Sequence, residues 1–221
     1  MFDAVLFDMD GVLIDSEPVH ELVTIEALQA HALPIPNDAE WLSIFLGRPD
    51  RDGLHDWFAL HGISAAVEPV MANKLERFEA RFAELVRAFE DGQWLARELH
   101  AAGVPLALVT GARRVEADLV LRHFALGDVF AATVSADDVT VGKPDPEPYL
   151  LGAALLGVGA EDCVVIEDSV AGLTSATSAG ARAIIVDRLG VPGRFSPHVP
   201  VLQFDVVVRD RLLGCWSSRQ G

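Results

Sequence analysis

The sequence is poor in basic residues and in cysteine. Against 33 aspartates and glutamates it has only 17 lysines and arginines, which gives a net charge of −16 at pH 7. Nucleic acid is bound by basic surfaces, so we expect no nucleic-acid partner for so acidic a chain. The two cysteines, Cys163 and Cys215, do not make a disulfide framework or a metal cluster. Free thiols fit the reducing cytoplasm, where we expect the protein to reside.

Long apolar runs and an amino-terminal targeting signal are also missing. No stretch approaches the roughly 20 apolar residues of a membrane-spanning helix, so we expect no membrane partner. The chain reaches an acidic motif at Asp8 without the basic segment that opens a secretory signal. Its 221 residues, 51% of them hydrophobic, suit one domain or one domain with an insertion. We expect a monomer.

The pattern along the chain predicts an α/β protein with a helical insertion. Residues 18–89 are helical in periodicity, and their clearest apolar stripe includes Phe78, Phe82 and Phe89. The strands expected elsewhere are 4–7, 105–109, 132–135, 164–166, 183–186 and 206–208, and helices are expected at 115–122, 146–156 and 172–179. Alternating strands and helices indicate a parallel sheet with helices on both faces. We therefore expect a core domain of residues 1–15 and 90–221, with 16–89 inserted as a helical domain.

Polar residues stand at the ends of expected strands, or just after one, at four places. They are Asp8 with Asp10, Thr110, Lys143, and Glu167 with Asp168. In an open α/β sheet, ligands bind beyond the carboxyl ends of the strands. These side chains are therefore expected to converge on one pocket.

This mixture of side chains suits phosphoryl transfer. A carboxylate that attacks a phosphate dianion meets like charge, which costs roughly 4 kcal/mol per unit pair at about 4 Å and an effective dielectric constant near 20. A divalent cation and a lysine can remove most of that repulsion, and carboxylate and carbonyl oxygens suit Mg²⁺. Asp8 and Asp10 project to the same side of an extended chain, so one can act as nucleophile and the other as acid/base.

Four segments together resemble the motifs of haloacid-dehalogenase-superfamily phosphatases. They are Asp-Met-Asp-Gly-Val-Leu-Ile-Asp-Ser-Glu at 8–17, Leu-Val-Thr-Gly at 108–111, Gly-Lys-Pro-Asp-Pro at 142–146 and Val-Ile-Glu-Asp-Ser at 165–169. Their order and the helical insertion are similar to the subfamily with an α-helical cap, which includes sugar-phosphate phosphatases and β-phosphoglucomutases. The resemblance covers nearly the whole chain and implies a Rossmann-like core, Mg²⁺ as cofactor and a phosphorylated small-molecule substrate.

The resemblance also implies a role for each acidic motif residue. Asp8 is the nucleophile that forms an aspartyl-phosphate. Asp10 is the acid/base, and its backbone carbonyl ligates Mg²⁺. Asp8 and Asp168 supply carboxylate ligands, and Glu167 is either a metal ligand or a partner of one.

Three further residues of the core are expected to contact the substrate. Thr110 can donate a hydrogen bond to a phosphoryl oxygen, and Gly111 beside it is counted with the substrate-binding residues. By the resemblance, Lys143 bridges the nucleophile and the phosphate. These assignments complete the site that the core motifs predict.

Substrate-binding residues are also expected in the inserted cap. Similar mutases have a histidine at the position of His20, although an ordinary surface or core histidine is an equal alternative. Arg48 and Arg51 are candidates for contacts with a distal phosphate or sugar hydroxyls, with solvated side chains as the alternative, and Lys74 is a candidate for facing the substrate. Where those mutases carry an arginine for the second phosphate, the simplest alignment places Asp50, for which Arg48 or Arg51 could compensate.

The cap is expected to act as a lid with hinges near residues 14–16 and 89–92. Relatives often have a Pro-Gly pair where the chain re-enters the core. This chain has Glu-Asp-Gly-Gln at 90–93 instead. The second hinge therefore departs from the family pattern.

The sequence favours a Mg²⁺-dependent phosphatase acting on a small phosphorylated metabolite, such as a sugar phosphate. The alternatives are a phosphomutase of the β-phosphoglucomutase type and, more remotely, a non-catalytic module that binds a phosphorylated ligand. Two other kinds of ligand site are excluded. No Gly-x-Gly-x-x-Gly of a dinucleotide-binding site follows a strand, and the glycine of Asp-x-Asp-Gly falls too early for the calcium loop of an EF-hand.

Overall fold

The structure is a computed structural model that describes residues 1–45, 50–188, 190, 194–196 and 202–217. The chain forms two compact units. Unit 1 comprises residues 1–15 and 88–221, and unit 2 comprises residues 16–87. The chain therefore leaves unit 1 after its first strands, builds unit 2 and returns.

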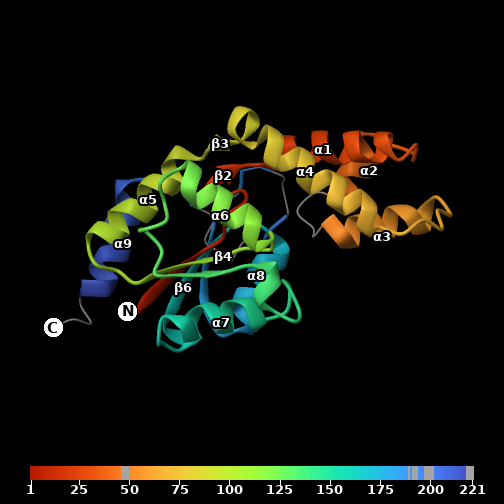
Figure 1. The fold of residues 1–221 in the computed structure, drawn as a ribbon. Coiled ribbons are helices and arrows are strands. Elements are labelled where there is room, and N and C mark those ends of the chain that lie inside the picture. Colours follow the sequence, from red (N-terminus) through yellow and green to blue (C-terminus); the bar gives the residue numbers. More distant parts are fainter. Residues whose placement is uncertain (46–49, 189, 191–193, 197–201, 218–221) are drawn as a thin grey trace. The chain divides into compact units, whose positions relative to one another are not determined.

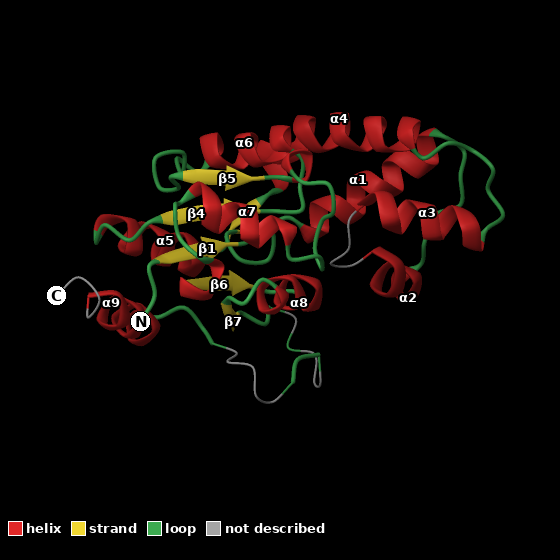
Figure 2. Ribbon diagram, turned by 90° about the horizontal axis from the view of Figure 1, so that it is seen from below, coloured by secondary structure: helices red, strands yellow, loops and turns green. Residues whose placement is uncertain are grey.

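Unit 1 contains a five-stranded sheet with the order β5-β4-β1-β6-β7. Its strands are β1 (Ala4–Phe7), β4 (Leu106–Val109), β5 (Ala132–Val134), β6 (Cys163–Glu167) and β7 (Arg182–Ile185). Neighbouring strands are parallel, and Figure 2 shows them side by side. Every residue of β1, β4 and β6 is buried, as expected for apolar strands in a sheet that is covered on both faces.

Helices cover both faces of this sheet, as Figure 1 shows. They are α5 (Glu90–Ala101) and α6 (Arg114–His123) on one face, and α7 (Glu147–Leu155) and α8 (Val170–Ser178) on the other. Two short 3₁₀ turns, η2 (Ala136–Asp138) and η3 (Ala160–Asp162), lie in the connections. The chain adds β4 and β5 on one side of β1, and then β6 and β7 on the other. Because crossovers between parallel strands are right-handed, this reversal places the two pairs of helices on opposite faces. The predicted α/β class is confirmed.

An apolar core fills the space between the sheet and the helices α7 and α8. Leu6, Val109 and Val165 contribute from neighbouring strands, and Tyr149 and Ala176 contribute from the two helices. All five side chains are fully buried. Burial of a leucine or valine side chain stabilises a fold by about 1.5–3 kcal/mol, so this core holds the strand ends in a fixed relation.

The topology brings the ends of three strands together. β1 lies between β4 and β6, and Phe7 pairs with Leu108 on one side and with Ile166 on the other. The chain runs from β1 through β4 to β5, then crosses back to β6 and β7. A ligand crevice forms at such a switch point, beyond the carboxyl ends of the strands.

The segment 206–208, which we predicted as a strand, instead begins the helix α9 (Val206–Ser217). Oδ1 of Asp205 accepts a hydrogen bond from the N–H of Val208 at 2.9 Å and caps the helix. Val208 and Leu212, one turn apart, are buried, whereas Val206 and Val207 are about half exposed. The β-branched run favours a strand, but the aspartate cap and the spacing of the buried residues determine a helix.

Unit 2 is helical. Its elements are α1 (Glu17–Ala30), the short α2 (Asp38–Glu40), the π-helical turn η1 (Trp41–Phe45), α3 (Asp50–Leu60) and α4 (Glu68–Leu85). Helices α1 and α4 pack against each other, and a core that includes Leu28, Trp57 and Phe58 fills the unit. Of the helices in the described ranges, none combines the length and apolar character that crossing a membrane requires.

The predicted aromatic stripe of unit 2 is shorter than expected. Phe78 and Phe82 are buried in α4 with their ring centroids 5.7 Å apart. The backbone becomes extended at Val86, the C-cap of α4, and the strand β3 (Arg87–Ala88) follows. Phe89 therefore lies outside the helix and belongs to unit 1. β3 forms a small two-stranded sheet with β2 (Ile14–Asp15).

Thr24, on the buried side of α1, provides a test of the packing of unit 2. Among the described residues, its Oγ1 is the buried side-chain polar atom without a hydrogen-bond partner. An unpaired buried hydroxyl costs about 1–3 kcal/mol, so Thr24→Val, which keeps the shape, is expected to raise the free energy of unfolding by about 1 kcal/mol. Urea unfolding measures the change.

Ser175→Ala is the matched control, because the Ser175 hydroxyl is also buried but donates to the carbonyl of Asp145 at 2.6 Å. Its loss is expected to lower the free energy of unfolding by about 1 kcal/mol. Equal destabilisation by both substitutions would show that the Thr24 hydroxyl has a partner in solution.

Candidate active site

The ammonium group of Lys143 joins the ends of three neighbouring strands. Its Nζ donates to Oδ1 of Asp8, which follows β1, at 2.7 Å, and to Oε1 of Glu167, at the end of β6, at 2.7 Å. The third acceptor is the carbonyl of Val109, at the end of β4, at 3.0 Å. An ammonium has three N–H donors, so the group is fully paired. The Lys143 side chain is only 10% exposed, and solvent screens these contacts weakly.

Hydrogen bonds fix the loop that carries Lys143. The carboxylate of Glu147, at the start of α7, accepts from the backbone N–H groups of Thr140 at 2.8 Å and Val141 at 2.9 Å. On the other side of the lysine, the carbonyl of Asp145 accepts from Ser175 of α8. The loop is thus held on both sides of Lys143, which directs the side chain toward the strand ends.

Asp8 is buried at the centre of this arrangement, with 7% of its surface exposed. Its backbone N–H donates to the carbonyl of Ile166 at 2.9 Å, which continues the pairing of β1 with β6. Burial raises the pKa of Asp8 to about 7, against the opposing charge of Lys143, and the nearby carboxylates of Glu167 and Asp10 add to the rise. The cluster therefore holds more negative charge than one lysine neutralises.

Both oxygens of Glu167 are engaged. Oε1 accepts from Lys143 and from the Tyr149 hydroxyl, the latter at 2.9 Å. Oε2 accepts from the backbone N–H groups of Asp168 and Ser169 and from the Ser169 hydroxyl, each at 2.9 Å. Burial alone would raise the pKa of Glu167, but Lys143 and these donors hold it below its ordinary value.

The oxygens of Asp8, Glu167 and Asp168 could hold a metal ion. One ligand oxygen from each lies within 4.8 Å of the others. Burial, together with the charges of Glu167 and Asp8, raises the pKa of Asp168 well above its ordinary range. A divalent cation would balance this excess of buried negative charge, and hard oxygen donors suit Mg²⁺. The residues present therefore fit such an ion.

Asp10 lies on a tight turn after β1 and is partly exposed. The turn is closed by a hydrogen bond of 2.9 Å from the N–H of Gly11 to the carbonyl of Ile14. Gly11 has a φ of +76°, and a β-carbon at this position would lie 2.2 Å from Oδ2 of Asp168. Glycine is therefore required here both by the backbone and by the space beside Asp168.

Thr110 lies at the end of β4 and is almost fully buried. Its N–H donates to the carbonyl of Val134 at 2.9 Å, and its Oγ1 accepts from the N–H of Ala112 at 3.0 Å. Accepting this bond leaves the hydroxyl hydrogen to be donated to a ligand. Gly111, next in the chain, is exposed, with open space beside its α-carbon.

The predicted residues of the insertion form a separate cluster within unit 2. Nζ of Lys74, in α4, lies 3.2 Å from Nδ1 of His20, in α1, and forms an ion pair with Asp50 at the start of α3. Lys74 is 3% exposed, and the His20 ring stacks on Phe78 with centroids 4.7 Å apart. Burial opposes ionisation of Asp50, but Lys74 and His20 hold its pKa below the ordinary value. Arg48 lies outside the described residues.

Two residues near the cluster escaped the sequence analysis. Tyr149 donates to Glu167, and its ring centroid lies 4.8 Å from Nζ of Lys143. It is the one tyrosine of the chain and precedes the apolar remainder of α7, a signal that could have identified it. The charge of Arg194 opposes the raised pKa of Asp168. The loop of Arg194 carries no periodic pattern, so this role has no signal in the sequence.

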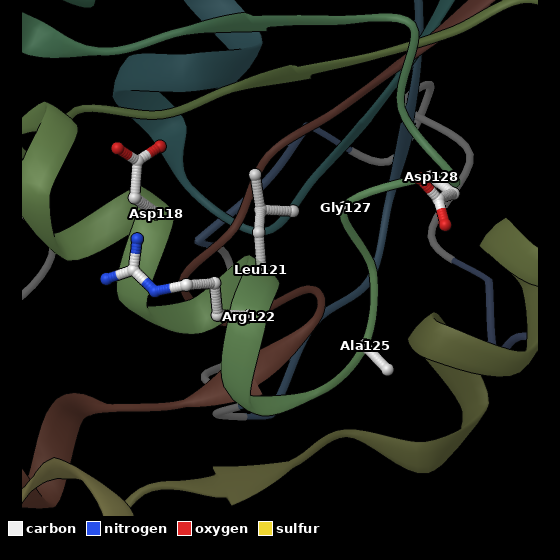
Figure 3. A pocket seen from close by; sticks show the side chains of 6 residues that line it. All are labelled: Asp118, Leu121, Arg122, Ala125, Gly127 and Asp128. Carbon is white, nitrogen blue, oxygen red and sulfur yellow. The ribbon is translucent and has the colours of Figure 1, made fainter.

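A shallow hollow elsewhere in unit 1, of about 360 Å³, contains none of the predicted site residues. Figure 3 shows its lining: Asp118, Leu121 and Arg122 from α6, and Ala125, Gly127 and Asp128 from the segment that follows. Its lining contains no residue of the cluster around Lys143, so the hollow supplies no chemistry to that cluster.

Comparison with known proteins identifies relatives over most of the chain. Residues 2–180 match the family model described as haloacid dehalogenase-like hydrolase. Hexitol phosphatase A of Escherichia coli is 36% identical over 186 residues, which is 82% of each chain. A phosphorylated carbohydrates phosphatase of Thermotoga maritima is 34% identical over 182 residues, covering 82% of this chain and 83% of that protein.

A solved structure has the same fold. The crystal structure of CbbY from Rhodobacter sphaeroides in complex with phosphate superposes with a TM-score of 0.83 at 26% sequence identity. The match covers 92% of this chain and 95% of that one. The resemblance seen in the sequence motifs is thereby confirmed.

The contact between α8 and Glu167 can be tested at Gly172. A β-carbon at Gly172 would lie 1.6 Å from Oε1 of Glu167, so Gly172→Ala must displace a carboxylate that accepts several hydrogen bonds. We expect a loss of about 3 kcal/mol or more in the free energy of unfolding. Gly127→Ala is the control, because nothing lies within 4 Å of its added β-carbon. Similar unfolding curves for the two variants would contradict the close approach.

Proposed function

Since the chain belongs to the haloacid dehalogenase-like hydrolases, we propose that it is a phosphatase that releases phosphate from a small phosphorylated metabolite through an aspartyl-phosphate. The observation that carries this proposal is the convergence of Asp8, Lys143 and Glu167 at the ends of adjacent strands. A buried carboxylate next to a paired ammonium provides both a nucleophile and a cation for a phosphoryl oxygen.

In the proposed reaction, an Asp8 oxygen attacks phosphorus, and the bond from phosphorus to the substrate oxygen breaks. Asp10 gives its proton to the departing oxygen. Asp10, now a carboxylate, takes a proton from a water molecule that attacks the aspartyl-phosphate, which releases phosphate and restores Asp8. Thr110 donates a hydrogen bond to the phosphoryl group, Gly111 lies beside it, and Lys143 offsets the negative charge.

We propose that Asp8, Asp168 and the backbone carbonyl of Asp10 hold Mg²⁺. When bound, the ion neutralises the carboxylates and the phosphoryl oxygens. Glu167 then acts as a partner of the site, because its two oxygens already accept from Lys143, Tyr149 and the Ser169 segment. Its role is to fix Lys143 and the turn after β6.

A phosphorylated sugar or sugar alcohol is the substrate class that we propose. Two observations support it: the names of the E. coli and T. maritima relatives, and the polar cluster of His20, Lys74 and Asp50 in unit 2. A carboxylate beside an ammonium and an imidazole offers acceptors and donors suited to hydroxyl groups. We propose that unit 2 is a cap domain, and that His20, Lys74 and Arg48 contribute to substrate binding.

Phosphate release is favoured over the mutase reaction. A mutase must bind a second phosphate, yet Lys74 is already paired with Asp50, and Arg51 is paired with Glu68 at 2.7 Å on the surface. Asp50 would itself repel a second phosphate. We further propose that the protein works as a monomer in the cytoplasm, without nucleic-acid or membrane partners.

The proposed nucleophile is tested with a panel of phosphorylated sugars and sugar alcohols and Mg²⁺, with free phosphate as the readout. Asp8→Asn is expected to lower turnover by about 10⁴-fold or more, because an amide cannot form the aspartyl-phosphate. Asp128→Asn, which alters an exposed carboxylate in the hollow of Figure 3, is the control and should keep full activity.

Activity that persists in Asp8→Asn would exclude the aspartyl-phosphate mechanism. No turnover of any compound, combined with binding of one of them, would instead identify a ligand-binding module. Conversion of a sugar 1-phosphate to its 6-phosphate faster than phosphate release would identify a mutase.

Metal binding should show in the pH dependence of stability. Because the pKa of Asp8 is raised from 3.8 to about 7 on folding, the metal-free fold loses stability as the pH rises between these values. Mg²⁺ binds the ionised carboxylates and removes this loss. The rise in Tm on adding Mg²⁺ is therefore expected to be larger at pH 8 than at pH 5, as measured by calorimetry. An equal rise at both pH values would contradict a metal site that includes Asp8.

A further inference from the structure

Arg188, which follows β7, connects three separate segments of unit 1. Its Nη1 and Nη2 donate to the two carboxylate oxygens of Asp91 at 2.9 and 2.8 Å, and its Nε donates to the carbonyl of Gly11 at 3.1 Å. The guanidinium carbon lies 4.1 Å from the ring centroid of Phe89 and 5.8 Å from that of Phe204. Hydrogen bonds thus hold the edges of the guanidinium group, and aromatic rings contact it as cation–π partners.

Apart from Phe204, the partners of Arg188 belong to the two segments through which the chain leaves and re-enters unit 1. Gly11 lies in the turn that begins with Asp8 and Asp10, and Phe89 and Asp91 lie where the chain returns from unit 2. The return segment is also bonded to the turn directly, because the N–H of Phe89 donates to the carbonyl of Leu13 at 3.0 Å. Arg188 therefore adds a third segment, the one that follows β7, to this junction.

The contacts of Arg188 fix the positions of its partners more than they neutralise charge. Arg188 is 22% exposed and Asp91 is 32% exposed, so their ion pair alone is partly screened. The planar fork defines both the distance and the orientation of the Asp91 carboxylate, which a lysine cannot do. Arg188 also binds a backbone carbonyl, so the position of Gly11 depends on the geometry of the fork. Asp91 stands in the segment by which the chain re-enters unit 1, so the ion pair ties that segment to Arg188.

We propose that Arg188 is a positioning residue for the catalytic turn. By holding the Gly11 carbonyl and the return segment in one plane, it keeps the adjacent Asp10 in the orientation needed for proton transfer and for its backbone carbonyl to face the metal. This inference rests on the proposed function. Arg188 itself touches none of the carboxylates of the metal cluster in its described contacts and is not a catalytic residue.

The first test is independent of activity. In Arg188→Ala, amide hydrogen exchange measured by mass spectrometry is expected to accelerate at least about tenfold in residues 10–15 and 88–93, with β4 unchanged. Arg209→Ala is the matched control, because Arg209 also pairs with a carboxylate, that of Glu98 at 2.8 Å, and lies 5.5 Å from the ring centroid of Trp94. Unchanged exchange in the two segments would overturn the proposal.

The second test uses the substrate and Mg²⁺ of the phosphatase assay. Arg188→Ala is expected to lower kcat at least about tenfold with KM changed less than about twofold, and Arg188→Lys should not restore it. Millimolar guanidinium chloride should restore part of kcat in Arg188→Ala, which a merely structural defect would not permit. Unchanged kcat, or loss without rescue, would overturn the positioning role. If the unaltered protein shows no turnover, the proposed function fails, and the exchange comparison alone decides whether Arg188 holds the turn.

Discussion

The ion-pair network around Lys143 is the constraint on which the arrangement of the strand ends in unit 1 depends. Its ammonium group binds acceptors at the ends of β1, β4 and β6, so it fixes the spacing of three strands as well as a charge. Removing one partner from such a buried pair costs about 3–5 kcal/mol, because the remaining charge is left without compensation. The loop around Lys143, the core below it and the hydroxyl of Tyr149 all serve to keep this group in one place.

The second constraint is an imbalance of charge. One lysine faces several carboxylates, and burial raises the pKa values of Asp8 and Asp168. Burial opposes ionisation of Glu167, but the charge of Lys143 and the hydrogen bonds to its oxygens hold its pKa below the ordinary value, so the excess charge falls on the other two. The proposed metal ion would balance this excess of negative charge. The acidic surface of the whole chain gives an anionic substrate no long-range attraction, so capture depends on this local balance.

The features that the sequence predicted are those that depend on short-range pattern. Apolar runs that end in Asp8, Thr110 and Glu167 are parallel strands in the structure, and chain topology brings their ends together. The features that were predicted wrongly or not at all depend on tertiary context. Val206–Val208 has a strand-like composition, but Asp205 caps a helix there. Phe89 has the right spacing for α4, yet the backbone leaves the helix before it. The pairing of Lys74 with Asp50, from separate helices, has no periodic signature at all.

The paired strands β2 and β3 have an evolutionary consequence. The chain leaves the sheet-bearing unit along one of them and returns along the other, so the two ends of the inserted unit are adjacent. A segment whose ends lie side by side can be lengthened, shortened or exchanged without altering the strand order of its host. Under the roles proposed for the two units, substrate preference would diverge by replacement of residues 16–87 as a block, while the machinery for phosphoryl transfer would be inherited unchanged.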